Sequence, residues 1–250
     1  MPTPQDHQLA VELAERAGVA LLELREQLTA EGADERTIKD RGDRVSHELL
    51  VAELARERPD DAVLSEEARA DEMADTTRLT APRVWIIDPL DGTREYGEGR
   101  SDWAVHVALV EQGVPTAGAV ALPGLGLVLG TGEPPTVPAA PEQLRVIVSR
   151  SRPPAEALAI ADGIGAELVE MGSAGAKAMA VVRGEADVYP HSGGQYEWDS
   201  AAPVAVALAA GLHCTRLDGS PLVYNREDPY LPDLLICRPE HAADVLAVIG

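Results

Sequence analysis

An apolar strand that ends in acids constrains this 250-residue chain more than any other feature of its sequence. The run Val84–Ile87 is β-branched and aromatic, and Asp88 follows it directly. Asp91 comes three residues later, before Gly92 and Thr93. Proteins of the α/β class place their chemistry where strands end, and two neighbouring carboxylates suit oxygen ligation of a hard divalent cation. The run therefore predicts a metal site at the mouth of a strand.

Two other interpretations of this run stay open. Asp, Pro and Gly are the commonest turn formers, so the segment can be a turn and nothing more. Aspartyl-phosphate phosphatases also continue from a strand to Asp and a DGT triplet, but there one residue separates the two acids. Here Pro89 and Leu90 both stand between Asp88 and Asp91, which argues against a phosphoenzyme mechanism.

Further acids stand in similar places along the chain. The short apolar run Ala62–Leu64 leads to the paired acids Glu66 and Glu67. Asp199 opens a long apolar stretch, and Asp43 precedes a predicted helix. Carboxylates that converge repel one another unless cations fill the space between them. Isolated acids are usually solvated surface groups, but acids at two strand ends and at one predicted helix start favour a cation-binding site.

The chain resembles the inositol monophosphatase-like superfamily of Mg²⁺-dependent, lithium-sensitive phosphatases in three metal-binding motifs, WIIDPLDGT, LSEEA and WDSAAP. Within that superfamily it is similar to the adenosine bisphosphate (PAP) phosphatases of the CysQ type in the segments MGSAGAKAMAVVRGEADVYP and VSRSR. The resemblance keeps the family's order and spacing from about Asp6 to the end. It implies a layered αβαβα sugar-phosphatase fold, with an α+β N-terminal half and an α/β C-terminal half.

The resemblance implies metal ligands at five positions. Glu66 matches the first carboxylate ligand, and Asp88 matches the acid that bridges two ions. Leu90 would contribute its backbone carbonyl, while Asp91 and Asp199 match the ligands of the second ion. Carboxylate and carbonyl oxygens suit Mg²⁺ better than Zn²⁺, which favours nitrogen and sulfur. We therefore expect two to three Mg²⁺ ions.

The resemblance also implies hydrolysis by a metal-activated water, without a phosphoenzyme. Thr93 would orient the water, Asp43 would accept a hydrogen bond from the Thr93 hydroxyl, and Glu66 would complete the catalytic group. Asp43 precedes Glu66 by 23 residues, the interval that the family implies for this partner. Asp is also well suited to cap a helix N-terminus, so that role for Asp43 stays open.

Two predicted helix starts would face the substrate. Gly92 and Thr93 would present backbone N–H groups to the phosphate, because a helix N-terminus favours anions. Gly172 and Ser173 open a helix at the position where the family binds the ribose and its second phosphate. Lys177 lies one turn along on the same face, with a solvated helix lysine as the alternative. The predicted substrate contacts are Gly92, Thr93, Gly172, Ser173, Lys177 and Asp199.

Hydrophobic periodicity predicts the remaining helices and strands. Apolar residues recur at helical spacing over residues 7–30 and again over Arg44–Arg58, where Pro59 stops the helix. The other expected helices are 155–163, 173–183, 199–210 and 239–249. The expected strands are 62–64, 84–87, 103–110, 115–122, 126–130, 144–148, 167–171, 186–189 and 234–237.

A linker divides the chain. The segment Thr131–Pro141 holds four prolines and no apolar periodicity, which is typical of a connection. Strands and helices alternate after it, as in layered α/β structures. We therefore expect an α+β domain over residues 1–135 with most of the metal ligands. An α/β domain over residues 142–250 would carry the substrate residues and the last metal ligand.

Several histidines and aromatic residues near these motifs also invite interpretation. Alternation along its strand predicts that His106 points to a polar face as a surface group. His191 lies in a Gly-rich segment, His191–Gln195, that we predict as a loop, and it either contacts substrate or lies on the surface. Tyr196 can stack on a base, whereas Trp198 is expected in the core.

Charge limits the partners of this chain. There are 42 Asp and Glu against 21 Lys and Arg, a formal net charge of −21, which disfavours nucleic acid and anionic membranes. Bound Mg²⁺ would have to reverse the local field before a phosphate ester could bind. No apolar run has transmembrane length, and Cys214 and Cys237 lack metal-ligand spacing and are expected to pack as small hydrophobes. We expect a cytoplasmic protein, with a homodimer left open.

The leading hypothesis is a phosphatase that converts adenosine 3′,5′-bisphosphate to AMP and phosphate, in support of sulfate assimilation. The closest alternative is the same chemistry on inositol monophosphate or fructose 1,6-bisphosphate, separately or together. A non-catalytic metal- or phosphate-binding module is an alternative of another class. It is disfavoured because Thr93 is present together with all the acids.

Overall fold

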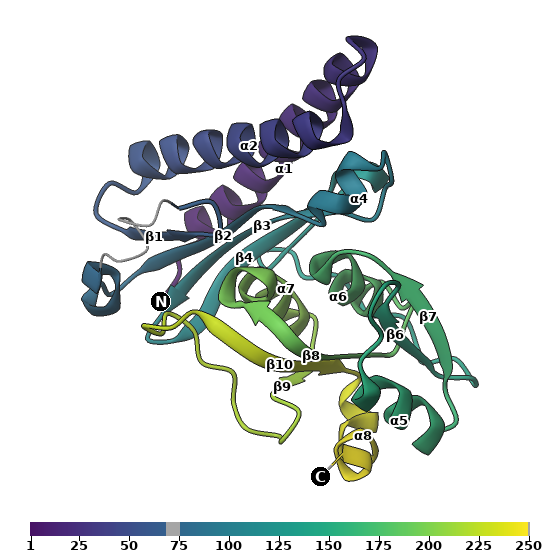
Figure 1. Cartoon of the computed structure of the whole chain (residues 1–250). Coiled ribbons are helices and arrows are strands. Elements are labelled where there is room, and N and C mark those ends of the chain that lie inside the picture. Colours follow the sequence, from purple (N-terminus) through teal and green to yellow (C-terminus); the bar gives the residue numbers. More distant parts are fainter. Residues whose placement is uncertain (69–75, 250) are drawn as a thin grey trace.

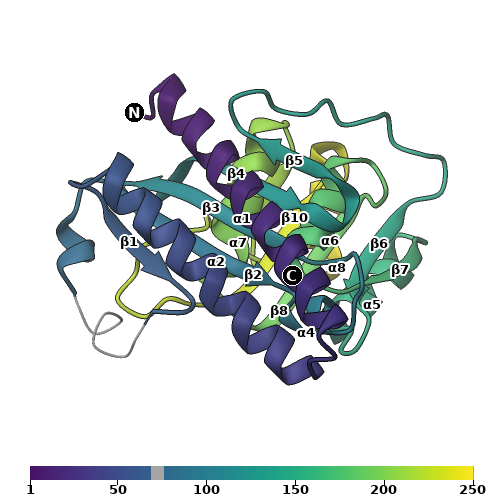
Figure 2. The same ribbon diagram turned by 90° about the horizontal axis from the view of Figure 1, so that it is seen from above.

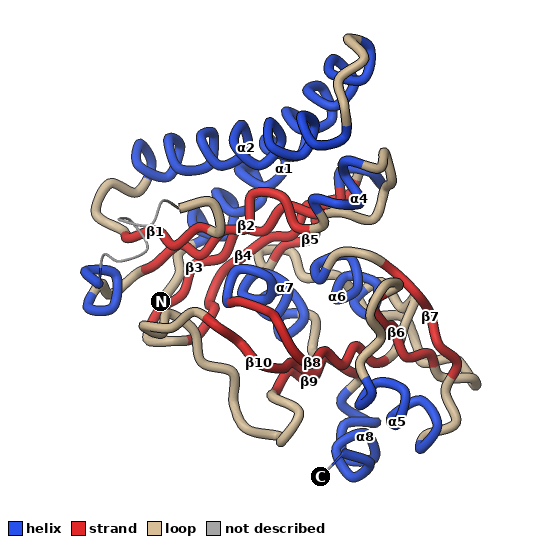
Figure 3. The backbone as a smooth tube through the Cα atoms, in the orientation of Figure 1, coloured by secondary structure: helices blue, strands red, loops and turns tan. Residues whose placement is uncertain are grey.

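The computed structural model describes residues 1–68 and 76–249, which form a stack of alternating helical and sheet layers (Figure 1). Two helices cover the outer face of the first sheet, two lie between the sheets, and two cover the far face of the second sheet (Figure 3). From top to bottom of the view these pairs are α1 (Pro4–Ala30) and α2 (Glu35–Glu57), α6 (Ala174–Val182) and α7 (Glu197–Ala209), and α5 (Ala155–Gly163) and α8 (Ala242–Ile249). The layered αβαβα fold predicted from the sequence is confirmed.

The first sheet has five strands in the order β1-β2-β3-β4-β5. Only β1 and β2 are parallel among these neighbours, and every later pair is antiparallel. The strands are β1 (Ala62–Ser65), β2 (Val84–Asp91), β3 (Ala104–Glu111), β4 (Val114–Leu122) and β5 (Leu127–Gly130). A short helix, α4 (Thr93–Gly97), directly follows β2.

The second sheet also has five strands, in the order β7-β6-β8-β10-β9. β6 is parallel to both of its neighbours, and β10 is antiparallel to β8 and β9. The strands are β6 (Arg145–Ser149), β7 (Glu167–Met171), β8 (Val188–Tyr196), β9 (His213–Thr215) and β10 (Tyr230–Cys237). The loop predicted over His191–Gln195 is wrong, because these residues belong to β8: His191, Ser192 and Gln195 pair with β10, and the register is irregular at the two glycines between them.

All eight residues of β2 are buried, because helices cover both faces of its sheet. Trp85 and Ile87 pack in the cluster under α1 and α2, whereas Val84 and Ile86 face the helices between the sheets. A strand covered on both faces needs apolar residues at every position rather than at alternate ones. This explains the continuous apolar run that precedes Asp88.

The two outer helices lie across the first sheet when it is seen from above (Figure 2). α2 begins at Glu35, nine positions before its predicted start at Arg44. Its N-cap is Asp34, whose side chain accepts a hydrogen bond from the Thr37 N–H at 2.7 Å. The N-cap alternative for Asp43 is therefore wrong, because Asp43 lies inside the helix.

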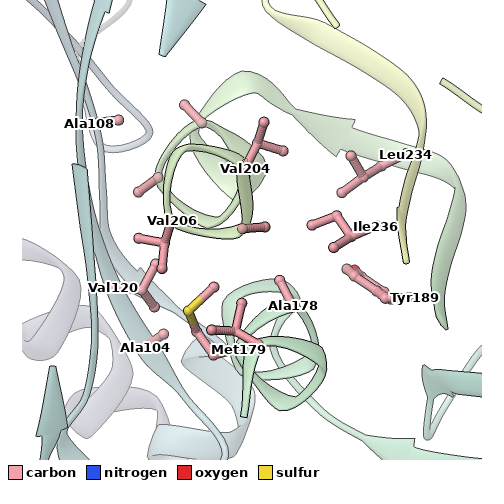
Figure 4. Close-up of a cluster of buried hydrophobic side chains, with 14 of the residues drawn as sticks. Ala104, Ala108, Val120, Ala178, Met179, Tyr189, Val204, Val206, Leu234 and Ile236 are labelled. Carbon is pink, nitrogen blue, oxygen red and sulfur yellow. The ribbon is translucent and has the colours of Figure 1, made fainter. Parts of the chain in front are cut away.

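A central core joins the two halves of the chain. Val120 of β4, Met179 of α6, Val206 of α7 and Ile236 of β10 belong to one buried cluster (Figure 4). No helix or strand lies between Gly130 and Arg145, where the chain passes from the first sheet to the second. The two-domain division stays a prediction. In the described ranges, no helix combines the length and apolar character needed to cross a bilayer.

Candidate active site

Three carboxylates converge between the two sheets. Ligand oxygens of Asp88, Asp91 and Asp199 all lie within 4.8 Å of one another. Asp88 and Asp91 end β2 of the first sheet, and Asp199 lies in the first turn of α7. Only 1% of Asp88 and 6% of Asp91 is exposed. The structure thus brings together acids that stand more than 100 residues apart in the sequence.

An irregularity in β2 aims Asp88 and Asp91 at the same space. Residues three positions apart in a regular strand point to opposite faces. Here Asp88 pairs with His106 and Asp91 with Ala104, so three steps of β2 match two steps of β3. Such a bulge turns a side chain away from its regular direction. The carbonyl of Pro89, inside the bulge, accepts a hydrogen bond from the Ser46 hydroxyl at 2.6 Å.

Burial and neighbouring acids raise the pKa of three carboxyl groups at this site. Burial and the charge of Glu66 raise the pKa of Asp88 well above its usual range. Burial and Asp91 raise the pKa of Asp199 to about 7. The Glu66 residue is exposed overall, but loss of hydration at its carboxyl group, together with the charge of Asp199, raises its pKa to about 8. Mutual repulsion of this kind is relieved by a bound cation.

Leu90 and Thr93 complete the end of the strand. The Leu90 N–H donates to Asp88 at 3.0 Å, and the Leu90 carbonyl accepts a hydrogen bond from the Thr93 hydroxyl at 3.0 Å. The same hydroxyl lies 3.4 Å from an oxygen of Asp43 on α2. Burial and the nearby charge of Glu67 raise the pKa of Asp43 to about 7.

Asp91 also holds the start of α6. It accepts hydrogen bonds from the Ser173 hydroxyl, from the Ala174 N–H at 3.1 Å and from the Gly175 N–H at 2.6 Å. The Ser173 oxygen in turn accepts from the Ala176 N–H at 3.0 Å, so Ser173 is the N-cap of the helix. Asp91, at the end of β2 in the first sheet, therefore fixes the start of α6, which follows β7 of the second sheet.

His106 is buried in this site, so the prediction of a surface histidine is wrong. The side chain is 0% exposed, its Nδ1 lies 3.0 Å from the Trp198 carbonyl, and its Nε2 lies 3.4 Å from Asp91. Strand alternation assumes a solvated face, but β3 has helices on both sides. A Cβ on Gly175 would lie 2.0 Å from the His106 Nε2. The close approach of α6 to the His106 ring therefore requires glycine at position 175.

A cleft of about 420 Å³ opens beside the carboxylates. Gly92 stands in its wall with a φ of 84°, and α4 begins at the next residue, Thr93. Gly172, Ser173, Lys177 and Asp199 also line the cleft, as do cations that the sequence analysis did not assign. These additional cations are Arg94, Arg100, Arg150 and Arg152. The segment VSRSR was the only sequence signal for two of them.

Lys177 is not a solvated helix lysine, so that alternative is wrong. The residue is 5% exposed, its ammonium group donates to the Ser173 carbonyl, and its Nζ lies 5.4 Å from the centre of the Tyr189 ring. Burial lowers the pKa of Lys177, although the charges of Asp91 and other acids oppose this shift. The ammonium group thus lies beside the cleft with little competing water.

His191 and the aromatic residues lie on the side of the cleft formed by the second sheet. His191 lines the cleft, and its buried Nε2 has no hydrogen-bond partner in the described part of the chain. Burial and the charge of Lys177 lower the pKa of His191 to about 4. Trp198 is 6% exposed, as expected for the core, and Tyr196 stacks on it with ring centres 4.9 Å apart.

Comparison with known proteins gives the family. The model of the inositol monophosphatase family matches residues 5–247. The chain is 51% identical over 259 residues to the 3′-phosphoadenosine 5′-phosphate phosphatase of Mycobacterium leprae, a match that covers 98% of this chain and 93% of that relative. It is 30% identical over 200 residues to the 3′(2′),5′-bisphosphate nucleotidase CysQ of Escherichia coli, covering 76% and 80% of the two chains.

A solved structure agrees with these sequence matches. CysQ from Bacteroides thetaiotaomicron superimposes with a TM-score of 0.77 at 27% identity, over 94% of this chain and 97% of that one. The chain therefore belongs to the inositol monophosphatase family, and its enzyme class is phosphatase. The family is metal-dependent, and the residues at the end of β2 fit a metal: Oδ2 of Asp88 is buried without a hydrogen-bond partner among the described residues, beside two further carboxylates.

Proposed function

We propose that this chain is a Mg²⁺-dependent phosphatase that removes the 3′-phosphate of adenosine 3′,5′-bisphosphate and leaves AMP and inorganic phosphate. The observation that carries the proposal is the position of the carboxylate cluster, which adjoins a cleft lined by five cationic side chains. Relatives with 51% and 52% identity are named as phosphatases of this substrate. A cleft of about 420 Å³ falls in the ordinary range for small-molecule sites.

The acids at the end of β2 would hold the metal ions. Glu66, Asp88, Asp91 and Asp199 offer carboxylate oxygens, and Leu90 offers its carbonyl. When bound, two to three Mg²⁺ ions neutralise phosphate charge and lower the pKa of water. Oxygen-only ligation favours Mg²⁺ over softer metals. The buried Asp88 oxygen without a partner is the strongest support for this assignment.

Thr93 and Asp43 would orient the attacking water. The Thr93 hydroxyl has one proton to donate, and the Leu90 carbonyl and Asp43 stand within reach of it. When that proton is donated to either acceptor, the Thr93 oxygen is left to accept a hydrogen bond from water. This hydrogen bond would orient the water so that a lone pair on the water oxygen points at phosphorus. The pKa of about 7 for Asp43 means that this group can exchange a proton near neutral pH.

The other phosphate and the nucleoside would lie in the cationic part of the cleft. Lys177 offers its ammonium group there, and the backbone of Gly92 and Thr93 would bind the phosphate that is removed. The Ser173 hydroxyl is already engaged by Asp91, so we assign its part in binding to the shape of the turn at Gly172–Ser173. The five cations explain how a chain of net charge −21 could take a substrate with two phosphates.

Phosphate release from three substrates tests the proposal. With Mg²⁺ present, we expect kcat/KM for adenosine 3′,5′-bisphosphate to exceed those for inositol monophosphate and fructose 1,6-bisphosphate. EDTA should abolish all turnover, and Mg²⁺ should restore it. A higher kcat/KM for inositol monophosphate would instead assign the chain as an inositol phosphatase. A role in sulfate assimilation in the cytoplasm belongs to the same proposal and fails with it.

A further inference from the structure

A carboxylate outside the metal cluster joins the two sheets across the cleft. Asp102 lies in the connection between α4 and β3, and 13% of its side chain is exposed. It accepts hydrogen bonds from the Arg100 Nε at 2.9 Å, from the Gly172 N–H at 2.7 Å and from the Arg150 guanidinium. Arg100 belongs to the same connection, whereas Gly172 and Arg150 follow strands of the second sheet.

One of these three partners begins a strained turn. Ser173, the residue after Gly172, has a backbone φ of 53°. Residues other than glycine rarely adopt this conformation. Such conformations cost free energy and persist only where the surroundings hold them. Asp91 holds the turn from one side through the Ser173 hydroxyl, and Asp102 holds it from the other through the Gly172 N–H.

The surroundings of the turn leave little room for another arrangement. A Cβ on Gly172 would lie 2.3 Å from an oxygen of Glu95, so this carboxylate lies directly against the turn. Glu95 is also 3.6 Å from the Arg150 guanidinium. Burial alone would raise the pKa of Asp102, but hydrogen bonds from Arg150 and Gly172 outweigh it and lower the pKa. The carboxylate therefore stays charged near neutral pH.

We propose that Asp102 is a positioning residue, which fixes Arg150 and the Gly172–Ser173 turn against the cleft without contacting the metal cluster. A charged acceptor makes a stronger hydrogen bond to a backbone N–H than a neutral one does. Arg150 and Gly172 line the cleft, so their placement sets how the substrate is received. The choice of substrate in the kinetic test rests on the proposed function, whereas the positioning role itself does not.

Hydrogen exchange of the whole chain tests the role directly. In Asp102→Ala, backbone amides of residues 172–176 should exchange about tenfold faster, as expected for the loss of one hydrogen bond to a charged acceptor. Asp61→Ala is a matched control, because Asp61 is a similarly enclosed carboxylate that accepts from Arg83 and Trp85 at the other end of β2. That control should leave exchange at residues 172–176 unchanged.

A milder variant keeps the test informative if Asp102→Ala does not fold. Asp102→Asn retains an oxygen that can accept from the Gly172 N–H but loses the charge, so its exchange should lie between those of the wild type and Asp102→Ala. Unchanged exchange in both Asp102 variants would overturn the proposal. Equal acceleration in Asp61→Ala would do the same, because it would show general loss of stability.

Kinetics separate positioning from a purely structural role. With adenosine 3′,5′-bisphosphate, Asp102→Ala should raise KM about tenfold, while kcat changes far less because the metal-binding acids keep their contacts. Asp61→Ala should leave both constants close to those of the wild type. A fall in kcat with KM unchanged would contradict the proposal. Absence of turnover in the wild type would refute the proposed function. The positioning role of Asp102 would then still be tested by hydrogen exchange, which does not depend on activity.

Discussion

In the metal-free protein, the free energy of unfolding should fall as the pH rises from 6.5 to 8. Asp88 has a pKa well above its usual range, and the pKa values of Glu66 and Asp199 are raised to about 8 and about 7. In the unfolded chain these acids lose their protons near pH 4. The folded state therefore binds more protons than the unfolded state between the two pKa values, and its stability falls as pH rises through that range.

The size of the effect follows from the protons retained. One retained proton is worth about 1.4 kcal/mol per pH unit, so any carboxyl group that keeps its proton across this range lowers the stability by about 2 kcal/mol. Asp199 contributes only below its pKa of about 7, and screening by solvent reduces the share of the more exposed Glu66. Asp199 and Glu66 together are expected to contribute about 1–2 kcal/mol, and Asp88 adds to this loss in the same direction.

Two buried histidines set the lower limit of the range. Burial lowers the pKa of His106 and of His191 from 6.5. Their effect has the opposite sign, because the unfolded imidazoles bind protons below pH 6.5 and the folded ones do not. As the pH rises above 6.5 the unfolded imidazoles also become neutral, so the histidines progressively stop opposing the effect of the carboxylates.

Urea unfolding in EDTA, at several pH values from 6.5 to 8, measures the effect. A parallel series in excess Mg²⁺ should not lose stability with pH, because the cation competes with protons for the same oxygens. Asp88→Asn should make the slope in EDTA less steep, because it removes one of the carboxyl groups whose pKa is raised. A flat or rising stability in EDTA would refute the reasoning that these acids are forced together in the metal-free protein.

Four further outcomes are expected. Asp88→Asn and Asp199→Asn should each abolish phosphate release while circular dichroism stays unchanged and the metal-free melting temperature stays equal or rises; turnover like that of the wild type would disprove the metal assignment. Lys177→Ala should lower kcat/KM for adenosine 3′,5′-bisphosphate by about 1.5–3 kcal/mol in free-energy terms and affect inositol monophosphate much less, whereas equal losses would mean a structural role. Gly175→Ala should destabilise the protein by about 1–3 kcal/mol, because its Cβ would meet the His106 ring; addition of His106→Ala should recover part of the loss, and an unchanged urea midpoint in the single variant would contradict the predicted clash. Lithium should inhibit uncompetitively with respect to substrate in steady-state assays, and insensitivity would indicate an altered second metal site.

The sequence predicted those parts of the fold whose signals are local. α5 and β7 have the bounds expected from their apolar patterns. The start of α2 escaped prediction because residues 35–43 are mostly polar. The helix over residues 35–43 is held by the Asp34 cap and by the close approach of Gly42 to the ring of Tyr96. The second of these contacts exists only in the tertiary structure.

The site was predictable only in part for a related reason. Asp88, Asp91 and Asp199 stand in motifs, and the structure brings them together. His106 was misplaced, because alternation along a strand does not reveal that helices cover both faces of the sheet. Asp102 belongs to no recognised motif, and two of its three partners, Arg150 and Gly172, come from connections far away in the sequence.

Residues from both halves of the chain share the central core, so the two halves should hold together even if the chain is cut between them. Residues 131–144 contain no helix or strand and include none of the proposed site residues. The Thr131 hydroxyl contacts His7, and the Pro138 carbonyl accepts from Arg238. Gln143 donates to the Gly165 carbonyl and Leu144 accepts from the Glu167 N–H, so the stretch between these contacts is residues 139–142. A cut there would leave two fragments whose apolar surfaces complete each other. Such fragments should associate when produced separately, and their association should restore the cleft, because its lining residues come from both halves of the chain.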